Sequence, residues 1–241
     1  MPEASPVLNN PYSEPSLHYW TSPEGELDYS KVLEDRRPFF PDVRSIPLEL
    51  GKQGEMLSVQ ETSDEWKRHV INLTRREVTA WREAKYPQTT RITRELLTFW
   101  FLNEERDPTQ SLFFAQREAV ETAIWLNEVA EKSNPGSYVL RMLEAAQKTV
   151  SADPVDQLPR VCFKMATGTG KTVVMAALIL YHFFNRQEYR SDTRFADNFL
   201  IIAPGITIRD RLGVLRVDAR GGHEASDYYT ERHLVPRTPE N

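Results

Sequence analysis

The residues best suited to chemistry form one short run, Met165-Ala166-Thr167-Gly168-Thr169-Gly170-Lys171-Thr172. Gly168 and Gly170 lack a Cβ, so the backbone can turn tightly and bring its N–H groups close to a polyphosphate. Lys171 would place a positive charge on the β and γ phosphates, and the Thr172 hydroxyl would ligate Mg²⁺. The run therefore predicts a loop that binds the phosphates of a nucleotide.

Apolar segments on both sides of this run must position it. Residues 160–165 are predicted to form a strand before the loop, and residues 173–181 to form a helix after it. This order suits a phosphate-binding loop, because the positive N-terminal end of the helix then faces the phosphates. The pattern G-x-x-x-x-G-K-[ST] fails at its first position, which holds Met165, but Gly168 inside the loop can supply the missing flexibility. The alternative interpretation is a chance glycine-rich turn.

The composition of the 241 residues is that of an ordinary globular protein, with a net charge of −5. This charge does not indicate nucleic-acid binding, so such binding would have to depend on local patches. The single cysteine, Cys162, cannot form an internal disulfide, and we expect a buried thiol in a reducing compartment. No stretch approaches the roughly 20 apolar residues of a membrane span, and the first residues lack a signal-peptide pattern. These features predict a cytoplasmic protein without membrane contact.

Shifts in composition divide the chain into three regions. Residues 1–35 are predicted to be an extended acidic arm, because the first 30 residues hold five acids, five prolines and no Lys or Arg. Residues 36–110 are expected to form an N-terminal accessory region. All five tryptophans precede residue 126, so the N-terminal half has material for its own core. Residues 111–241 hold the loop.

The accessory region combines strand-like and helical patterns. Residues 39–59 have a short strand-like pattern. A helix is predicted to begin near Thr62, which has capping-box spacing to Glu65. Residues 61–94 carry eight Lys or Arg against five acids. We interpret this excess as the solvated face of a helix. The alternative is phosphate contact by Arg75, Arg76, Arg82, Lys85, Arg91 and Arg94.

Further helices are predicted at residues 94–103, 113–129, 138–150 and 206–215. Asn134-Pro135-Gly136 is expected to end the second of these helices. Residues 199–203, Phe-Leu-Ile-Ile-Ala, form a continuous apolar run that predicts a strand covered on both faces.

Three segments then stand in an informative order. They are residues 114–119 (Phe-Ala-Gln-Arg-Glu-Ala), residues 165–172 and residues 203–211 (Ala-Pro-Gly-Ile-Thr-Ile-Arg-Asp-Arg). Over roughly residues 110–235, the chain resembles a superfamily 2 helicase of the DEAD/DEAH type, in the restriction-subunit branch of type III restriction endonucleases. In that family the segments are the Q motif, motif I and motif Ia. The resemblance implies an α/β fold, namely a partial RecA-like P-loop NTPase domain with a truncated parallel sheet after a mostly helical N-terminal region.

The resemblance also implies roles for individual residues. Gln116 would recognise the adenine edge, since an amide both donates and accepts hydrogen bonds. Its alternative role is that of a surface glutamine, because it lies 55 positions before Lys171 and the chain must fold back to bring them together. Lys171 and Thr172 would be catalytic, with Thr172 also ligating Mg²⁺. The ATP-binding set would be Gln116, Thr167, Gly168, Thr169, Gly170, Lys171 and Thr172.

Motif Ia would contact nucleic acid at the end of a strand. The residues concerned are Pro204, Gly205, Thr207, Arg209 and Arg211. The two arginines would act as charge-assisted phosphate donors. The alternative for these residues is an exposed helix surface without a ligand.

ATP hydrolysis in this family also needs motif II, an apolar strand that ends in an Asp-Glu pair. No two acids are adjacent after Lys171. We therefore expect an N-terminal part of a DNA helicase or translocase that is not catalytically complete by itself. DNA is the expected partner, with a methyltransferase subunit or the missing remainder of the motor as a further one.

Two other functions are compatible with parts of this pattern. A noncatalytic module could bind DNA or a partner without turnover. A small-molecule P-loop kinase is disfavoured, because such an enzyme usually has its loop close to the chain start, and because it has no role for residues 203–211.

Overall fold

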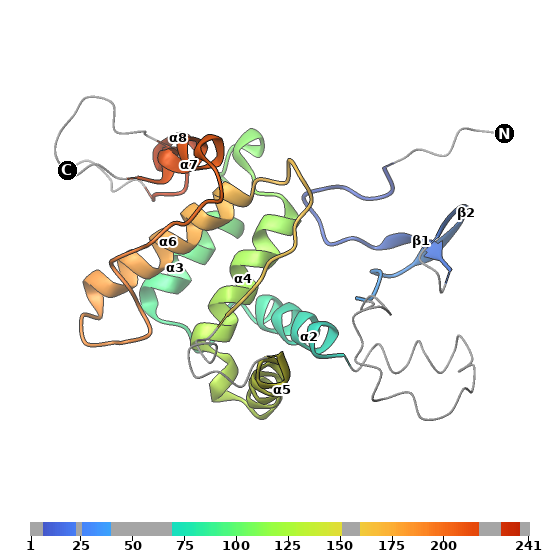
Figure 1. The fold of residues 1–241 in the computed structure, drawn as a ribbon, viewed down its shortest axis with the longest axis horizontal. Helices are drawn as coiled ribbons and strands as arrows, with labels where there is room; N and C mark the ends of the chain where they lie inside the picture. Colours follow the sequence, from blue (N-terminus) through green and yellow to red (C-terminus); the bar gives the residue numbers. More distant parts are fainter. Residues whose placement is uncertain (1–6, 23–25, 40–68, 151–159, 217–227, 237–241) are drawn as a thin grey trace.

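The computed structural model describes residues 7–22, 26–39, 69–150, 160–216 and 228–236, and helices make up most of it (Figure 1). The longer helices are α2 (Val70–Glu83), α3 (Arg91–Phe101), α4 (Phe114–Glu128), α5 (Asn134–Val150) and α6 (Lys171–Glu188). The shorter helical elements are η3 (Pro108–Gln110), η4 (Ala130–Lys132), α7 (Ile206–Leu212), η6 (Gly213–Leu215) and α8 (Tyr228–Glu231). Helix α4 packs against both α2 and α6, and α3 packs against α6.

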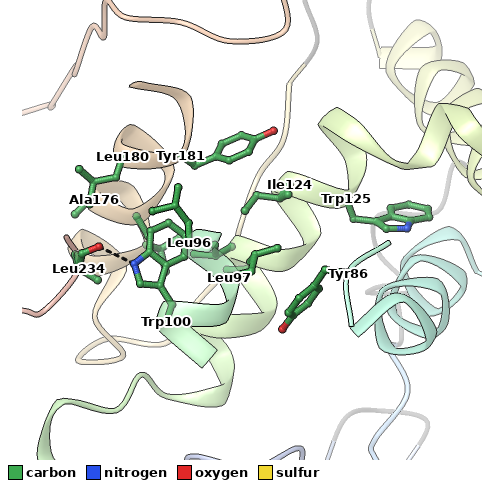
Figure 2. Packing of buried hydrophobic residues seen from close by; sticks show 14 of the residues in the cluster. Tyr86, Leu96, Leu97, Trp100, Ile124, Trp125, Ala176, Leu180, Tyr181 and Leu234 are labelled. Atoms are coloured by element: carbon green, nitrogen blue, oxygen red, sulfur yellow. Dashed lines mark hydrogen bonds between the residues drawn. The ribbon is translucent and has the colours of Figure 1, made fainter. Parts of the chain in front are cut away.

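The core lies where α3, α4 and α6 meet (Figure 2). Leu97, Trp100 and Ile124 are at most 2% exposed, and Ala176 of α6 is fully buried among them. The indole Nε1 of Trp100 donates a hydrogen bond to the carbonyl of Leu234 at 2.7 Å. This bond satisfies the polar end of a buried indole and holds the segment after α8 against α3.

A buried carboxylate links α2 to α4. Glu121 is 0% exposed and accepts hydrogen bonds from Arg82 Nε at 2.7 Å, Arg117 Nε at 2.8 Å and the Tyr86 hydroxyl at 2.6 Å. An unpaired carboxylate at this position would cost several kcal/mol. Three donors around one carboxylate therefore specify how α2 lies on α4.

A second polar cluster holds α6 in place. Glu128 of α4 accepts from the Thr90 N–H at 2.8 Å and from the Thr93 hydroxyl at 2.5 Å. Asn185 of α6 donates to the same Thr93 hydroxyl at 2.9 Å and accepts from the Thr90 hydroxyl at 2.5 Å. Since Thr90 is also the N-cap of α3, one cluster joins α3, α4 and α6 and orients the helix that follows the loop.

The N-terminal region contains a hairpin where we expected an extended arm. Strands β1 (Leu17–Thr21) and β2 (Leu27–Glu34) pair antiparallel, with a register shift between Tyr19 and Trp20. Tyr19 stacks edge-on against Tyr29 at 5.0 Å between centroids, and the Lys31 ammonium lies 5.2 Å from the Trp20 ring. Cross-strand aromatic contacts of this kind stabilise a hairpin.

Most predicted helices are confirmed, with shifted boundaries. Asn134-Pro135-Gly136 was expected to end a helix, but it begins α5. Proline is tolerated there because the N–H groups of a first helical turn have no intrahelical acceptor. The helix predicted at 206–215 is α7 followed by η6. The strand-like pattern from residue 40 to 59 and the predicted helix start at Thr62 lie outside the described residues.

The predicted strands at 160–165 and 199–203 are wrong for this structure. In the described part of the chain, the β1–β2 hairpin is the only sheet. A strand exists only where a neighbour completes its hydrogen-bond ladder, and no described segment does so here. Leu200 and Ile202 are accordingly 86% and 83% exposed. Cys162 is also exposed, so the prediction of a buried thiol is wrong for the same reason.

Candidate phosphate-binding site

The run from Ala166 to Thr172 forms a tight loop at the start of α6. Gly168 and Gly170 have φ of +82° and +75°, which residues with a Cβ rarely adopt. Helix α6 has no side-chain cap at its N-terminus and no acid in its first turn. Among the described residues no acceptor contacts the N–H of Lys171 or Thr172, and the first bonded N–H is that of Val173. An 18-residue helix with free N-terminal donors attracts an anion, so the loop fits a phosphate group.

The loop closes on one carbonyl oxygen. Lys171 Nζ and the Thr169 hydroxyl both donate to the Ala166 carbonyl at 2.7 Å. The Lys171 side chain is exposed, so an incoming phosphate can reach its ammonium. A charged phosphate oxygen is a stronger acceptor than a neutral carbonyl. The arrangement therefore allows Lys171 to exchange the carbonyl for a phosphate.

Gln116 lies directly against this loop. It is 5% exposed, which excludes the alternative of a surface glutamine. Its Oε1 accepts from the Phe113 N–H at 2.9 Å, and its Nε2 donates to the Thr169 carbonyl at 3.0 Å. A Cβ added at Gly170 would stand 2.1 Å from Nε2. The required fold-back of the chain is thus present, with α5 as the intervening helix.

The packing of the N-terminal segment against the start of α4 was not predicted from the sequence. The Phe114 N–H donates to the Pro11 carbonyl at 2.8 Å, and the Tyr12 ring lies 5.2 Å from the Phe113 ring. Asn10 Oδ1 accepts from the Tyr12 N–H at 3.0 Å and shapes this turn. The only sequence signal was the Asn-Asn-Pro composition of a turn, which says nothing about what the turn contacts.

Ion pairs hold the same segment in place. Glu14 accepts from Arg82 at 3.1 Å and from Arg36 at 3.4 Å, and Arg36 also forms a two-pronged pair with Glu118 of α4. The guanidinium groups of Arg36 and Arg82 lie over the Phe114 ring, at 5.5 and 5.1 Å from its centroid. The N-terminal segment is therefore part of the surroundings of Gln116.

The proposed nucleic-acid-contacting residues lie in a separate, exposed segment. Pro204, Gly205, Thr207, Arg209 and Arg211 are all exposed, on α7 or just before it. Among the described residues, the ion-pair partner of Arg209 is its neighbour Asp210, at 3.2 Å, and exposed pairs of this kind contribute little to stability. Figure 1 shows α7 toward the end of α6 at which the loop lies. Within the described ranges, no hydrogen bond or ion pair joins this segment to the loop.

The described residues contain no group of three or more His, Cys, Asp or Glu side chains that could hold a metal ion. Thr172, on the first turn of α6, is the predicted magnesium ligand. Mg²⁺ at nucleotide sites is commonly held by one or two protein oxygens together with phosphates and water, so a single hydroxyl fits that role.

Residues 110–219 match a family model described as "Type III restriction enzyme, res subunit". The matched range contains Gln116, the loop, and α7. No curated protein and no solved structure matches the chain. Among the described helices, none is both long and apolar enough to cross a membrane.

Proposed function

We propose that this chain binds ATP with Mg²⁺ at the loop of residues 166–172, because residues 110–219 match the family model of type III restriction enzyme res subunits, a helicase-type family. The chain would serve as the nucleotide-binding part of a helicase or translocase that acts on DNA. Hydrolysis of the bound ATP by water, in the complete motor, would supply the free energy for its movement.

The observation that carries this proposal is the contact between Gln116 and the loop. Two segments that resemble the Q motif and motif I of helicases lie 53 residues apart at their point of contact, and one hydrogen bond joins them. If the loop were a chance glycine-rich turn, contact with this particular glutamine would not be expected. The contact therefore favours a nucleotide site over the alternative of a fortuitous turn.

Each residue of the site has a distinct task in the proposal. The backbone of Thr167, Gly168, Thr169 and Gly170 would surround the phosphates, and Lys171 would leave the Ala166 carbonyl to bind them. Thr172 would ligate Mg²⁺. Gln116 would recognise adenine, which requires it to exchange at least one of its two present hydrogen bonds.

The DNA contact would come from the exposed segment that begins at Pro204. Its backbone and Thr207 would bind a phosphate, assisted by Arg209 and Arg211. Since the sequence has no adjacent Asp-Glu pair after Lys171, we expect no ATP turnover above that of a Lys171→Ala variant. A methyltransferase subunit or further motor segments would complete the active assembly.

Calorimetric titration of the chain with Mg-ATP tests the proposal. We expect wild-type protein to bind, and Lys171→Ala to lose binding because its charge faces the phosphates. Lys164→Ala is the matched control, since Lys164 is also exposed and precedes the loop. Comparison of ATP with GTP in Gln116→Ala then tests adenine recognition, with a loss of preference as the expected result.

Absence of ATP binding by a wild-type chain that still unfolds cooperatively would contradict the proposal. The noncatalytic module would then be the better interpretation. Equal loss of binding in Lys164→Ala and Lys171→Ala would show a general charge effect, and would contradict the specific role of the loop.

A further inference from the structure

A concave surface lies between α2 and the segment that follows β2. Its volume is about 460 Å³. We refer to it as the arginine groove, because four arginines and only two glutamates are among its lining residues. These charged residues are Arg36, Arg37, Arg75, Arg76, Glu14 and Glu83.

The walls of the arginine groove are held in a defined position. Asn72 of α2 accepts from the Phe39 N–H at 2.8 Å and donates to the Phe39 carbonyl at 3.0 Å. The Phe39 ring also packs against His69 at 5.0 Å between centroids. The segment that carries Arg36 and Arg37 is therefore clamped onto α2 by its backbone, and the groove is built before any ligand arrives.

Two arginines of this groove, Arg75 and Arg76, differ from other basic residues on α2 and α3. Arg82 pairs with Glu121 and Glu14, while Arg91 pairs with Glu95 and Glu188. Those two arginines therefore serve a structural role, because their charges are neutralised by ion pairs within the protein.

Arg75 and Arg76 have no such partners. Arg75 is half-buried, yet neither it nor Arg76 has a hydrogen-bond acceptor or an ion-pair partner among the described residues. Burial, and then the neighbouring charge of Arg36, lower the pKa of the Arg75 guanidinium, and the charges of Glu118 and Glu14 offset this effect only in part. Placing a partly desolvated cation beside another cation is unfavourable, so an anion in the groove would relieve an existing cost.

The chemistry of the groove indicates which anion it would take. The planar guanidinium group can form two parallel hydrogen bonds to the oxygens of one phosphate. The amide in the lining, Asn72, already uses its oxygen and its nitrogen in hydrogen bonds with Phe39. The groove is also open to solvent and Arg76 in its lining is exposed, which suits an extended polymer that passes over it. Such a site can bind the charged phosphates of a nucleic-acid backbone, whereas the Asn72 amide has no free polar atom with which to recognise a base.

We infer that the arginine groove binds the phosphate backbone of DNA, through Arg75 and Arg76, without regard to base sequence. This contact goes beyond the proposed nucleotide site and does not require ATP. Through this contact the N-terminal region would help to position the duplex, in addition to the DNA contact proposed for the segment that begins at Pro204.

Fluorescence anisotropy with two short labelled duplexes of unrelated sequence tests the inference, without nucleotide and over a range of salt concentrations. We expect the double variant Arg75→Gln/Arg76→Gln to bind both duplexes roughly tenfold more weakly or worse. The slope of log K against log salt should fall by about 2, close to 1 for each lost phosphate contact. A thermal scan should show that the variant is folded, because the change removes two unpaired cations.

The matched control is Arg141→Gln/Arg190→Gln, which removes the same charge from two exposed arginines elsewhere on the surface. It should bind DNA with nearly the wild-type slope. Lys171→Ala should also bind DNA normally, which separates this inference from the nucleotide site.

Four results would overturn the inference. The first is no DNA binding by the wild-type chain, and the second is an equal loss in the groove variant and its control. The third is a loss with only one of the two duplexes, which would indicate base recognition. The fourth comes from calorimetry with pyrophosphate, which tests whether the groove is instead a site for free phosphate. If the groove variant loses pyrophosphate binding but binds DNA as the wild-type chain does, the groove does not contact the DNA backbone.

Discussion

Gly170 illustrates how one residue can serve both a backbone turn and a side-chain contact. Gly170 is the N-cap of α6 and has a φ of +75°, and because it lacks a Cβ it leaves room for the Gln116 amide. Gly168 has a similar φ of +82° but faces open space. The two glycines therefore offer a natural comparison between backbone strain alone and strain combined with loss of the Gln116 contact.

Alanine at Gly170 should destabilise the protein more than alanine at Gly168. Both substitutions place a Cβ at positive φ, which costs on the order of 1–2 kcal/mol. Only Gly170→Ala also displaces Gln116 from its two hydrogen bonds, with a further loss of about 1–2 kcal/mol. Chemical denaturation of both variants measures this difference.

The same comparison in a Gln116→Ala background provides the control. There the two glycine variants should lose nearly equal stability, because no amide remains to be displaced. An unchanged difference between them would mean that Gly170 matters for a reason other than Gln116.

At the scale of the helix, α6 carries a titratable group in apolar surroundings. His182 packs against Tyr181 at 4.8 Å and Phe195 at 6.3 Å between ring centroids. Its Nδ1 is buried and has no hydrogen-bond partner among the described residues. Burial lowers the pKa of His182 in the folded protein, since no group compensates the charged imidazole.

This lowered pKa predicts a loss of stability in acid. Below about pH 6.5, the unfolded chain takes up a proton at His182 that the folded protein resists, so the free energy of unfolding falls as the pH decreases. Stability curves for wild type, His182→Phe and His182→Gln between neutral pH and pH 5 measure the effect. Both variants are neutral throughout, so both should show a shallower decline than wild type, whatever their stability at neutral pH. Parallel curves for all three proteins would refute the prediction.

On the scale of the whole molecule, the N-terminal hairpin is connected to the helices through a few polar contacts. Glu14 joins the segment before β1 to Arg36 after β2 and to Arg82 of α2, while Arg36 reaches Glu118 of α4. Glu14 and Arg36 of this set also line the arginine groove. The position of the hairpin, the start of α4 and the groove thus depend on one shared set of charges.

Substitution of Glu14 by Gln should loosen this connection. Loss of two partly exposed ion pairs, each contributing about 0.5 kcal/mol, should increase opening of the segment roughly fivefold. Limited trypsin digestion, followed at Lys31, Arg36 and Arg37, measures that opening. Glu26→Gln is the control, because Glu26 is exposed and has no ion pair among the described residues. Equal cleavage rates in the two variants would show that Glu14 does not hold the segment.

Local patterns determined a substantial part of this protein. The glycine-rich loop before an apolar helix, and the helices near residues 114–128 and 206–212, were predictable because backbone preference and 3.6-residue periodicity act over a few neighbouring residues. The chemistry proposed for Lys171 and Thr172 likewise follows from residue type and spacing, and it stays a prediction.

Only the tertiary structure decided which distant segments meet. The contact of Gln116 with Thr169, the docking of Pro11 on Phe114 and the arginine groove all join residues far apart in sequence. Burial depends in the same way on neighbours, so the apolar runs that predicted strands, and the thiol of Cys162, are exposed where no ladder partner is described. Periodicity reports which faces of a segment are apolar, whereas packing and hydrogen-bond pairing decide what covers them.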